Sequence, residues 1–284
     1  MRDLLYKLIG ATGERRDAQL RTWLVLTGGS ALATAAVLPY ALQMSASRIE
    51  KARQAALRAG KPLRAQPPLP VLMGLGVVQS TILFGLVAAL GLRTGRAQGL
   101  GAPHLEALLN GEPAGLDPQD VAAYAAAGAA GAGGIILLEY TLFHDLHEQL
   151  NDGGMGDPGG WKGLLASTYG AIAEEVMMRL GLQTFLSAGI RRLRGETGRP
   201  VHPATMWSAV VLANVGFGLG HLPAMVGSVP ITGRLALRAV VLNGLVGLIL
   251  GYLYWRHGLE AAITAHGSAD LVLHVLLPAI DRRS

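Results

Sequence analysis

Long apolar stretches constrain the fold of this chain more than any other feature of its sequence. They lie at about residues 23–44, 71–92, 121–143, 161–186, 203–220, 235–255 and 259–278. A transmembrane helix needs roughly 20 mostly apolar residues, and continuous apolar blocks of that length are typical of membrane spans. The sequence therefore predicts an all-α, polytopic membrane helical bundle with about seven transmembrane helices and additional interfacial helices.

The composition agrees with a protein embedded in a lipid bilayer. Apolar residues make up 51% of the 284 positions and charged residues 15%, whereas soluble domains have roughly 25% charged residues. The net charge of +5 comes from Lys and Arg placed mainly between the apolar stretches, as is usual in membrane proteins. We therefore expect contact with lipid and no nucleic-acid partner. The abundance of Arg, Ala and Gly favours an integral protein of the bacterial cytoplasmic (inner) membrane.

Two regions are expected along the chain. Residues 1–120 should form an N-terminal membrane region with an interfacial helix, two spans and a loop rich in Gly and Pro. Residues 121–284 should form a helical core that carries polar motifs at 174–179, 217–221 and 266–270. Residues 144–160 are polar, and we expect them to form a loop whose histidines are solvated rather than bound to a metal.

Glu174 and Glu175 lie side by side in the fourth apolar stretch, and Arg179 follows four residues later. Ionisable groups in hydrocarbon are costly and usually mark functional sites. Adjacent residues on an α-helix point about 100° apart, whereas residues four apart share a face. We therefore expect Glu175 to pair with Arg179, and Glu174 to face elsewhere, as suits a general base. The alternative is a purely structural salt bridge.

The fifth apolar stretch carries a second polar group. Asn214, Phe217 and His221 stand at positions i, i+3 and i+7, which share one face of a helix. Pro223 follows and interrupts the helix. Taken alone, a histidine at a helix end is more often a hydrogen-bonded or interfacial residue than a catalytic one, so this motif needs partners elsewhere in the chain.

The last apolar stretch carries His266, Asp270 and His274 at i, i+4 and i+8, again on one face. A histidine followed one turn later by a carboxylate suits a fixed imidazole tautomer or a metal site. A hydrogen-bond network between helices is the alternative. Glu139 and Asn243 are further isolated polar residues in apolar stretches, and the sequence does not rank them.

These motifs, EExxxR at 174–179, FxxxH at 217–221 and HxxxD at 266–270, resemble in this order the CPBP family of intramembrane proteases. That family includes the type II CAAX prenyl endopeptidases and the bacteriocin-processing (Abi) proteins. The resemblance covers roughly residues 161–274 and includes the flanking runs GLLASTYGAIAEEVMMR and FGLGHLPA. Each motif is short, and the specificity comes from finding three of them in order inside apolar stretches.

The resemblance implies an intramembrane endopeptidase that works without a covalent intermediate. Glu174 and His221 would activate a water molecule. His266 and Asp270 would stabilise the oxyanion of the tetrahedral intermediate. The remaining motif residues and their neighbours would support the site: Glu175, Arg179, Asn214 and Phe217.

Asp270 departs from the family pattern, because the best-characterised CAAX enzymes have Asn at this position. An ionised Asp cannot donate a hydrogen bond to an oxyanion. Either it is protonated, or it orients His266, or it helps to bind a metal. Glu174, His221 and His266 would supply a Glu-His-His zinc set, so zinc-dependent and metal-free catalysis both remain open.

Three functions compete on this sequence. The leading hypothesis is a membrane protease that cleaves a peptide or membrane-protein substrate. A non-catalytic bacteriocin-immunity or partner-binding protein is the second, although such a protein has no need to bury all three polar motifs. A proton-coupled transporter is the third, and the chain shows none of the internal repeats typical of that class.

Overall fold

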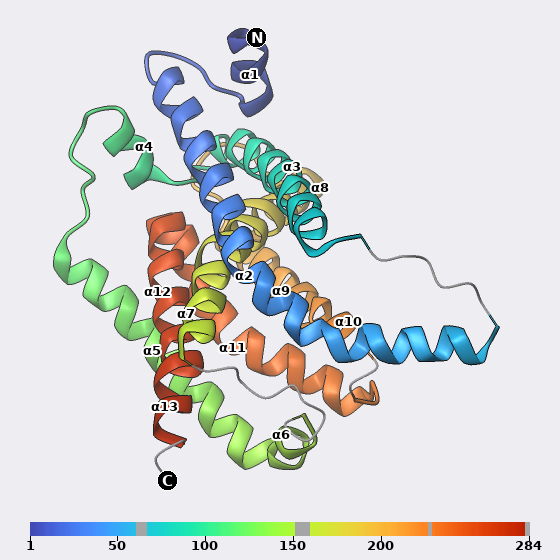
Figure 1. Ribbon diagram of the computed structural model, residues 1–284. Coiled ribbons are helices and arrows are strands. Elements are labelled where there is room, and N and C mark those ends of the chain that lie inside the picture. Colours follow the sequence, from blue (N-terminus) through green and yellow to red (C-terminus); the bar gives the residue numbers. More distant parts are fainter. Residues whose placement is uncertain (61–66, 151–159, 227–228, 282–284) are drawn as a thin grey trace.

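The computed structural model describes residues 1–60, 67–150, 160–226 and 229–281, and every regular element in these ranges is a helix (Figure 1). The predicted all-α class is confirmed. The α-helices are α1 (Arg2–Ile9), α2 (Arg16–Arg58), α3 (Leu69–Arg96), α4 (Pro103–Leu109), α5 (Pro118–Leu142), α6 (His144–Leu150), α7 (Gly160–Tyr169), α8 (Thr184–Leu193), α9 (Pro203–Gly220), α10 (Leu222–Met225), α11 (Gly233–His257), α12 (Leu259–Leu271) and α13 (Leu277–Asp281). Three further segments are π-helical: η2 (Gly170–Glu174), η3 (Val176–Gln183) and η4 (Val272–Leu276).

Six helical segments in the described ranges are long and apolar enough to cross a membrane, one fewer than the seven spans predicted. They are Arg16–Leu42, Leu69–Arg96, Pro118–Leu142, Pro203–Met225, Gly233–His257 and Leu259–Ile280. The predicted span at 161–186 is not among them. It is helical throughout, from α7 to α8, but its charged residues, among them Glu174, Glu175 and Arg179 near its centre, make it too polar.

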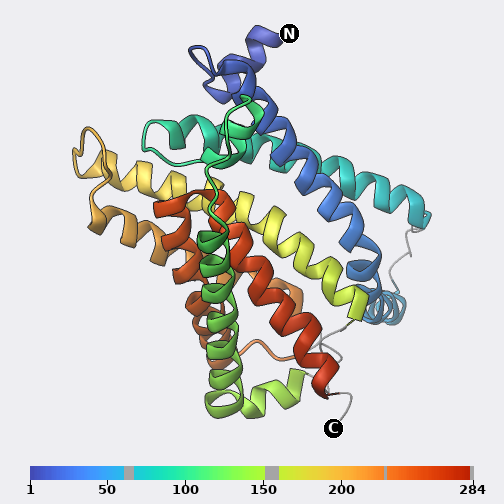
Figure 2. The same ribbon diagram turned by 90° about the vertical axis from the view of Figure 1, so that its left-hand side faces the viewer.

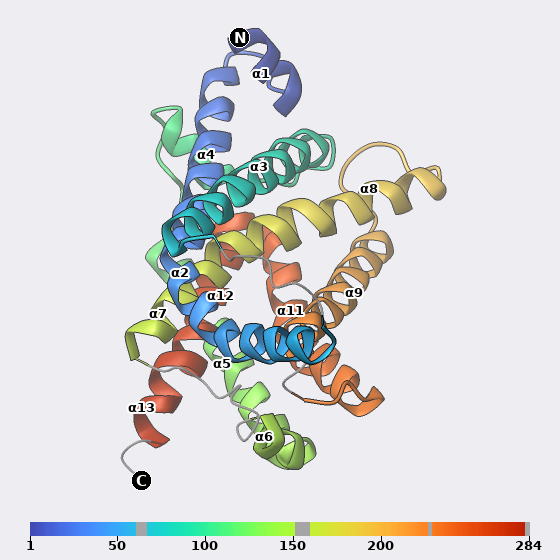
Figure 3. The same ribbon diagram turned by 45° about the vertical axis from the view of Figure 1, so that its right-hand side comes forward.

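This helix runs without interruption from α7 through η2 and η3 to α8, and Figure 3 shows it as one yellow rod. Its middle winds with π geometry, in which the backbone bonds span five residues rather than four. The Thr184 hydroxyl donates to the carbonyl oxygen of Arg179 at 3.0 Å, five residues back. Single π turns inside α-helices are frequent at functional sites, and nothing in the sequence predicted this one.

Helix boundaries follow local chemistry. Pro118 and Pro203 each occupy the first turn of a helix, where a missing N–H costs nothing. The side chain of Asp117 caps α5 by accepting from the backbone N–H of Gln119 at 2.8 Å. Between α11 and α12 the chain reverses at Gly258, whose φ of 93° is readily adopted only by glycine.

One predicted loop is partly wrong. Residues 144–150 form the short helix α6, which packs Leu146 and Leu150 into the interior. The rest of the expected loop, residues 151–159, lies outside the described residues. The loop was predicted from polarity alone, and a short helix that buries two leucines on one face is compatible with the same composition.

The core is built by α5, α9, α11, α12 and the rod from α7 to α8, together with residues of α2 and α3. Helix α12 packs against α5 and α11, and α11 packs against α9. Figure 2 shows α12 (red) crossing directly beside α5 (green). The α7–α8 rod contacts α2, α3, α9 and α12. Its central π segments are therefore enclosed by helices on several sides.

Close packing of α5 on α12 depends on Gly128. A methyl group at this position would lie 1.9 Å from the carbonyl oxygen of Ala265, which directly precedes His266. Because the obstacle is backbone, the Gly128→Ala variant must push α12 away from α5. We expect a loss of about 1–3 kcal/mol or more in unfolding free energy and a lower melting temperature in detergent.

Gly133 on the same helix is the matched control, because a methyl group there meets no atom within 4 Å. Gly133→Ala should leave the melting temperature unchanged or raise it slightly, since alanine favours helix by about 0.5–1 kcal/mol. Equal melting temperatures for the two variants would contradict the packing argument.

Candidate active site

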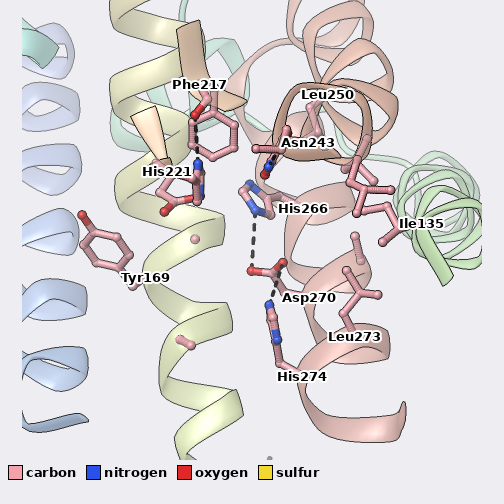
Figure 4. A pocket seen from close by; sticks show the side chains of 18 of the residues that line it. Ile135, Tyr169, Phe217, His221, Asn243, Leu250, His266, Asp270, Leu273 and His274 are labelled. Carbon is pink, nitrogen blue, oxygen red and sulfur yellow. Dashed lines mark hydrogen bonds and ion pairs between the residues drawn. The ribbon is translucent and has the colours of Figure 1, made fainter. Parts of the chain in front are cut away.

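One cavity of about 410 Å³ is lined by residues from all three sequence motifs (Figure 4). Helices η2 and η3 contribute Glu174 and Arg179. Phe217 comes from α9 and His221 directly follows that helix, and α12 contributes His266 and Asp270. The remaining wall is mostly apolar, with Ile135, Leu242, Val246, Leu250 and Leu273 among its members. Motif residues that are up to 96 positions apart in the sequence thus meet around one space.

The Glu175–Arg179 pair is present and is fully enclosed. Arg179 Nε lies 3.3 Å from Glu175 Oε2, and each side chain is only 1% exposed. Arg179 also donates from Nη1 and Nη2 to Asn214 Oδ1, both at 3.1 Å, and from Nη1 to Gln183 at 3.4 Å. All three guanidinium nitrogens therefore have acceptors, as a buried cation requires.

Glu175 has a second partner that helical spacing did not reveal. Its Oε1 lies 2.8 Å from His266 Nδ1 on α12. A carboxylate accepts, so Nδ1 of His266 must carry the proton. The buried pair is thereby connected to the cavity wall, and Glu175 orients the imidazole ring of His266.

Asp270 lies between two histidines on the same helix face. Its Oδ2 is 3.5 Å from His266 Nε2 and its Oδ1 is 3.9 Å from His274 Nε2. The predicted stripe of His266, Asp270 and His274 is confirmed. Gly170 on η2 permits this arrangement, because a methyl group there would lie 2.5 Å from Asp270 Oδ2 and 3.2 Å from His266 Nε2.

His221 is oriented by its own helix. Its Nδ1 lies 2.8 Å from the carbonyl oxygen of Phe217. A carbonyl can only accept, so Nδ1 is the protonated nitrogen and Nε2 is left with a lone pair. The Phe217 ring meets the imidazole edge-on, with 4.5 Å between the centroids. Within the described ranges Nε2 has no hydrogen-bond partner.

Glu174 differs from its neighbour Glu175 in exposure and in hydrogen-bond partners. It lines the cavity and is only partly buried. Among the residues that the structure describes, it makes no hydrogen bond and no ion pair. The groups that act on it electrostatically include His266, His221 and Asp270. A carboxylate with free lone pairs beside a histidine that has a free Nε2 is suited to hold and deprotonate a water molecule.

The zinc set considered from the sequence does not form. Within the described residues, no group of three or more His, Asp or Glu side chains is arranged to hold a metal ion. His266 commits Nδ1 to Glu175 and turns Nε2 toward Asp270. Glu174, His221 and His266 therefore share a cavity without the geometry of a ligand set.

A second buried ion pair lies at the cavity wall, where Arg238 on α11 is one of the lining residues. Arg238 donates through Nε to Glu139 Oε2 at 2.9 Å and through Nη2 to Glu139 Oε1. Glu139 also contacts His147 Nδ1 at 3.0 Å. This network joins α5, α6 and α11. The sequence had shown Glu139 only as an isolated polar residue and assigned it no role.

We expect Glu139→Gln to lower the unfolding free energy by about 1.5–3 kcal/mol, the usual value for a hydrogen bond to a charged group. The measurement is the melting temperature in detergent. Asp145→Asn is the matched control, because the Asp145–Arg234 pair is about half exposed and such pairs contribute about 1 kcal/mol or less. A larger loss for Asp145→Asn than for Glu139→Gln would contradict this ranking.

Sequence reasoning therefore identified most of the polar groups in the cavity and missed others. Tyr169, Gly170 and Arg238 line the cavity without having been predicted. Asn243 also lines it, although the sequence offered only an isolated polar residue in an apolar helix. That isolation was the one available signal, since buried polar groups in spans are usually functional.

Comparison with known proteins finds a family whose model covers the same three motifs. Residues 158–272 match the family model described as type II CAAX prenyl endopeptidase Rce1-like, and all three motifs lie inside the matched segment. The match confirms the family resemblance stated from the motifs. No curated protein and no solved structure matches the chain.

Proposed function

We propose that this chain, in which residues 158–272 match the family model of Rce1-like type II CAAX prenyl endopeptidases, hydrolyses peptide bonds inside the membrane. The six apolar helices support an integral membrane protein. We place it in the bacterial cytoplasmic membrane, with a peptide or membrane protein as substrate. The observation that carries the proposal is the cavity-lining carboxylate of Glu174, which makes no hydrogen bond or ion pair within the described residues.

Water activation is assigned to Glu174 and His221. A water molecule in the cavity would donate one hydrogen bond to the Glu174 carboxylate and the other to His221 Nε2. Glu174 takes the proton as the water oxygen attacks the carbonyl carbon of the scissile bond, and the carbonyl oxygen becomes an oxyanion. General base catalysis of this kind contributes about 10²–10⁴-fold to a rate.

Collapse of the tetrahedral intermediate uses the same proton. Protonated Glu174 returns it to the amide nitrogen while the C–N bond breaks, which yields a free amine and a new carboxyl terminus. Every proton and bond is then accounted for without a covalent enzyme intermediate. Glu174 ends ionised, ready for the next water molecule.

His266 and Asp270 are assigned to the oxyanion side of the cavity. Both Oδ2 of Asp270 and the Nε2 of a neutral His266 are acceptors, so one proton must lie between them for the contact to be attractive. A His266 imidazolium between Glu175 and Asp270 meets this requirement. It places a positive charge where the oxyanion develops, and Asp270 orients the ring.

The proposal is tested by comparing membranes that contain the wild-type protein with membranes that contain Glu174→Gln. New peptide termini should appear in membrane proteins only with the wild type, and purified wild-type protein in detergent should reproduce those cleavages. If the two membranes yield the same termini, the chain is not a protease of this kind, and the immunity and transporter hypotheses return.

A further inference from the structure

We propose that Asn243 on α11 donates a hydrogen bond to the oxyanion of the tetrahedral intermediate. This inference rests on the proposed peptidase activity and adds to it a catalytic residue outside the three motifs. It follows from two observations: the residue that faces His266 Nε2 is a carboxylate, Asp270, and among the described residues that line the cavity there is one side-chain amide, which belongs to Asn243.

An oxyanion needs hydrogen-bond donors aimed at the point where its charge develops. Asp270 is a poor candidate, because an ionised carboxylate only accepts. His266 Nδ1 already donates to Glu175, and Nε2 faces the Asp270 carboxylate at 3.5 Å. At least one additional donor on this side of the cavity would complete the site.

Asn243 has the required free group. Its Nδ2 donates one hydrogen bond, 2.8 Å long, to the carbonyl oxygen of Ala239 in the preceding turn of α11. An amide nitrogen carries two hydrogens, and the second has no acceptor among the described residues. Figure 4 shows the amide end of Asn243 directed toward the His266 ring. The bond to Ala239 holds the amide in place and leaves one N–H to the cavity.

Most of the other donors that line the cavity are held by other partners or point away from His266. Arg179 uses its three nitrogens on Glu175, Gln183 and Asn214. Arg238 is held by Glu139 through Nε and Nη2, whereas its Nη1 has no hydrogen-bond acceptor among the described residues. In Figure 4 the Tyr169 hydroxyl points toward the neighbouring blue helix and away from His266. Asn243 is therefore the donor best placed to act together with His266.

The test measures kcat and KM separately for Asn243→Ala and Asn243→Ser, with the substrate identified from the membrane comparison above. Removal of one oxyanion donor lowers kcat by about 10²–10³-fold, and KM should change little because the bond forms only in the transition state. Serine keeps a hydroxyl that can bond to the carbonyl of Ala239, as several serines in this chain do at i−4, but it lacks the amide.

The serine variant separates the catalytic role from a structural one. If Asn243 serves only to bond its own helix, Asn243→Ser should keep its melting temperature and its kcat. If Asn243 is an oxyanion donor, Asn243→Ser should fold and still lose at least 100-fold in kcat. A kcat within about twofold of the wild type, or a loss confined to KM, would overturn the proposal.

Glu174→Gln distinguishes this failure from failure of the proposed function. An inactive Glu174→Gln together with a fully active Asn243→Ser removes only the role of Asn243. A fully active Glu174→Gln removes the peptidase mechanism and with it the inference about the oxyanion.

Discussion

Glu174→Gln is expected to lower kcat for peptide cleavage by about 10²–10⁴-fold and to leave the protein folded. The rate falls because glutamine cannot accept a proton from water, and general base catalysis is worth this factor. The fold persists because Glu174 makes no hydrogen bond or ion pair within the described residues, and its side chain borders a cavity rather than packed atoms. The measurements are kcat and the melting temperature in detergent.

Glu175→Gln is the matched control, one residue away with the same chemical change. Glu175 is 1% exposed and is bonded to both Arg179 and His266. Its neutralisation should lower the melting temperature clearly, whereas Glu174→Gln should not. If Glu174→Gln is the variant that unfolds, or if it retains at least half of wild-type kcat, the division of roles between the two carboxylates is wrong.

Arg179→Met is expected to cost about 3–5 kcal/mol of unfolding free energy, the usual result of removing one partner from a buried ion pair. Methionine is similar in length but offers no donor, so Glu175 loses its cation and Asn214 loses two hydrogen bonds at once. A single domain has only about 5–15 kcal/mol of net stability. The loss is therefore a large fraction of the total, and the variant should melt at a clearly lower temperature in detergent than the wild type.

Two further variants test whether the loss of stability comes from the buried Glu175–Arg179 ion pair. The double variant Glu175→Gln/Arg179→Met should cost less than the sum of the two single changes, by about 0.5–3 kcal/mol, because groups in direct contact are not additive. Arg53→Met, at an arginine whose pair with Glu50 is about half exposed, should cost less than about 1 kcal/mol. Strict additivity, or equal losses at Arg53 and Arg179, would show that the ion pair does not stabilise the core.

Much of the fold could be predicted because membrane spans leave strong signals. The stretch predicted at 203–220 coincides with α9, and the stretches at 121–143 and 235–255 lie within three residues of the ends of α5 and α11. These predictions succeeded because hydrocarbon selects long apolar helices. The helix α6 was missed because its signal is two leucines in a polar segment.

The candidate site was predicted in part for a similar reason. Glu175 with Arg179, and His266 with Asp270, are four residues apart within one helix, so helical geometry alone brings each pair together. The bond from Glu175 to His266 joins residues 91 positions apart. No periodicity within a helix encodes such a contact.

By itself, the sequence determined the helical membrane class, the buried Glu175–Arg179 pair and the separation of Glu174 from it. The reason is that apolar length and helical spacing are local properties of the chain. Only the tertiary structure decided that Glu174 and His221 share a cavity, that Glu175 also holds His266, and that the amide of Asn243 reaches the same space. These contacts depend on how α9, α11 and α12 pack around a π-helical segment, and packing between distant helices leaves no periodic trace in the sequence.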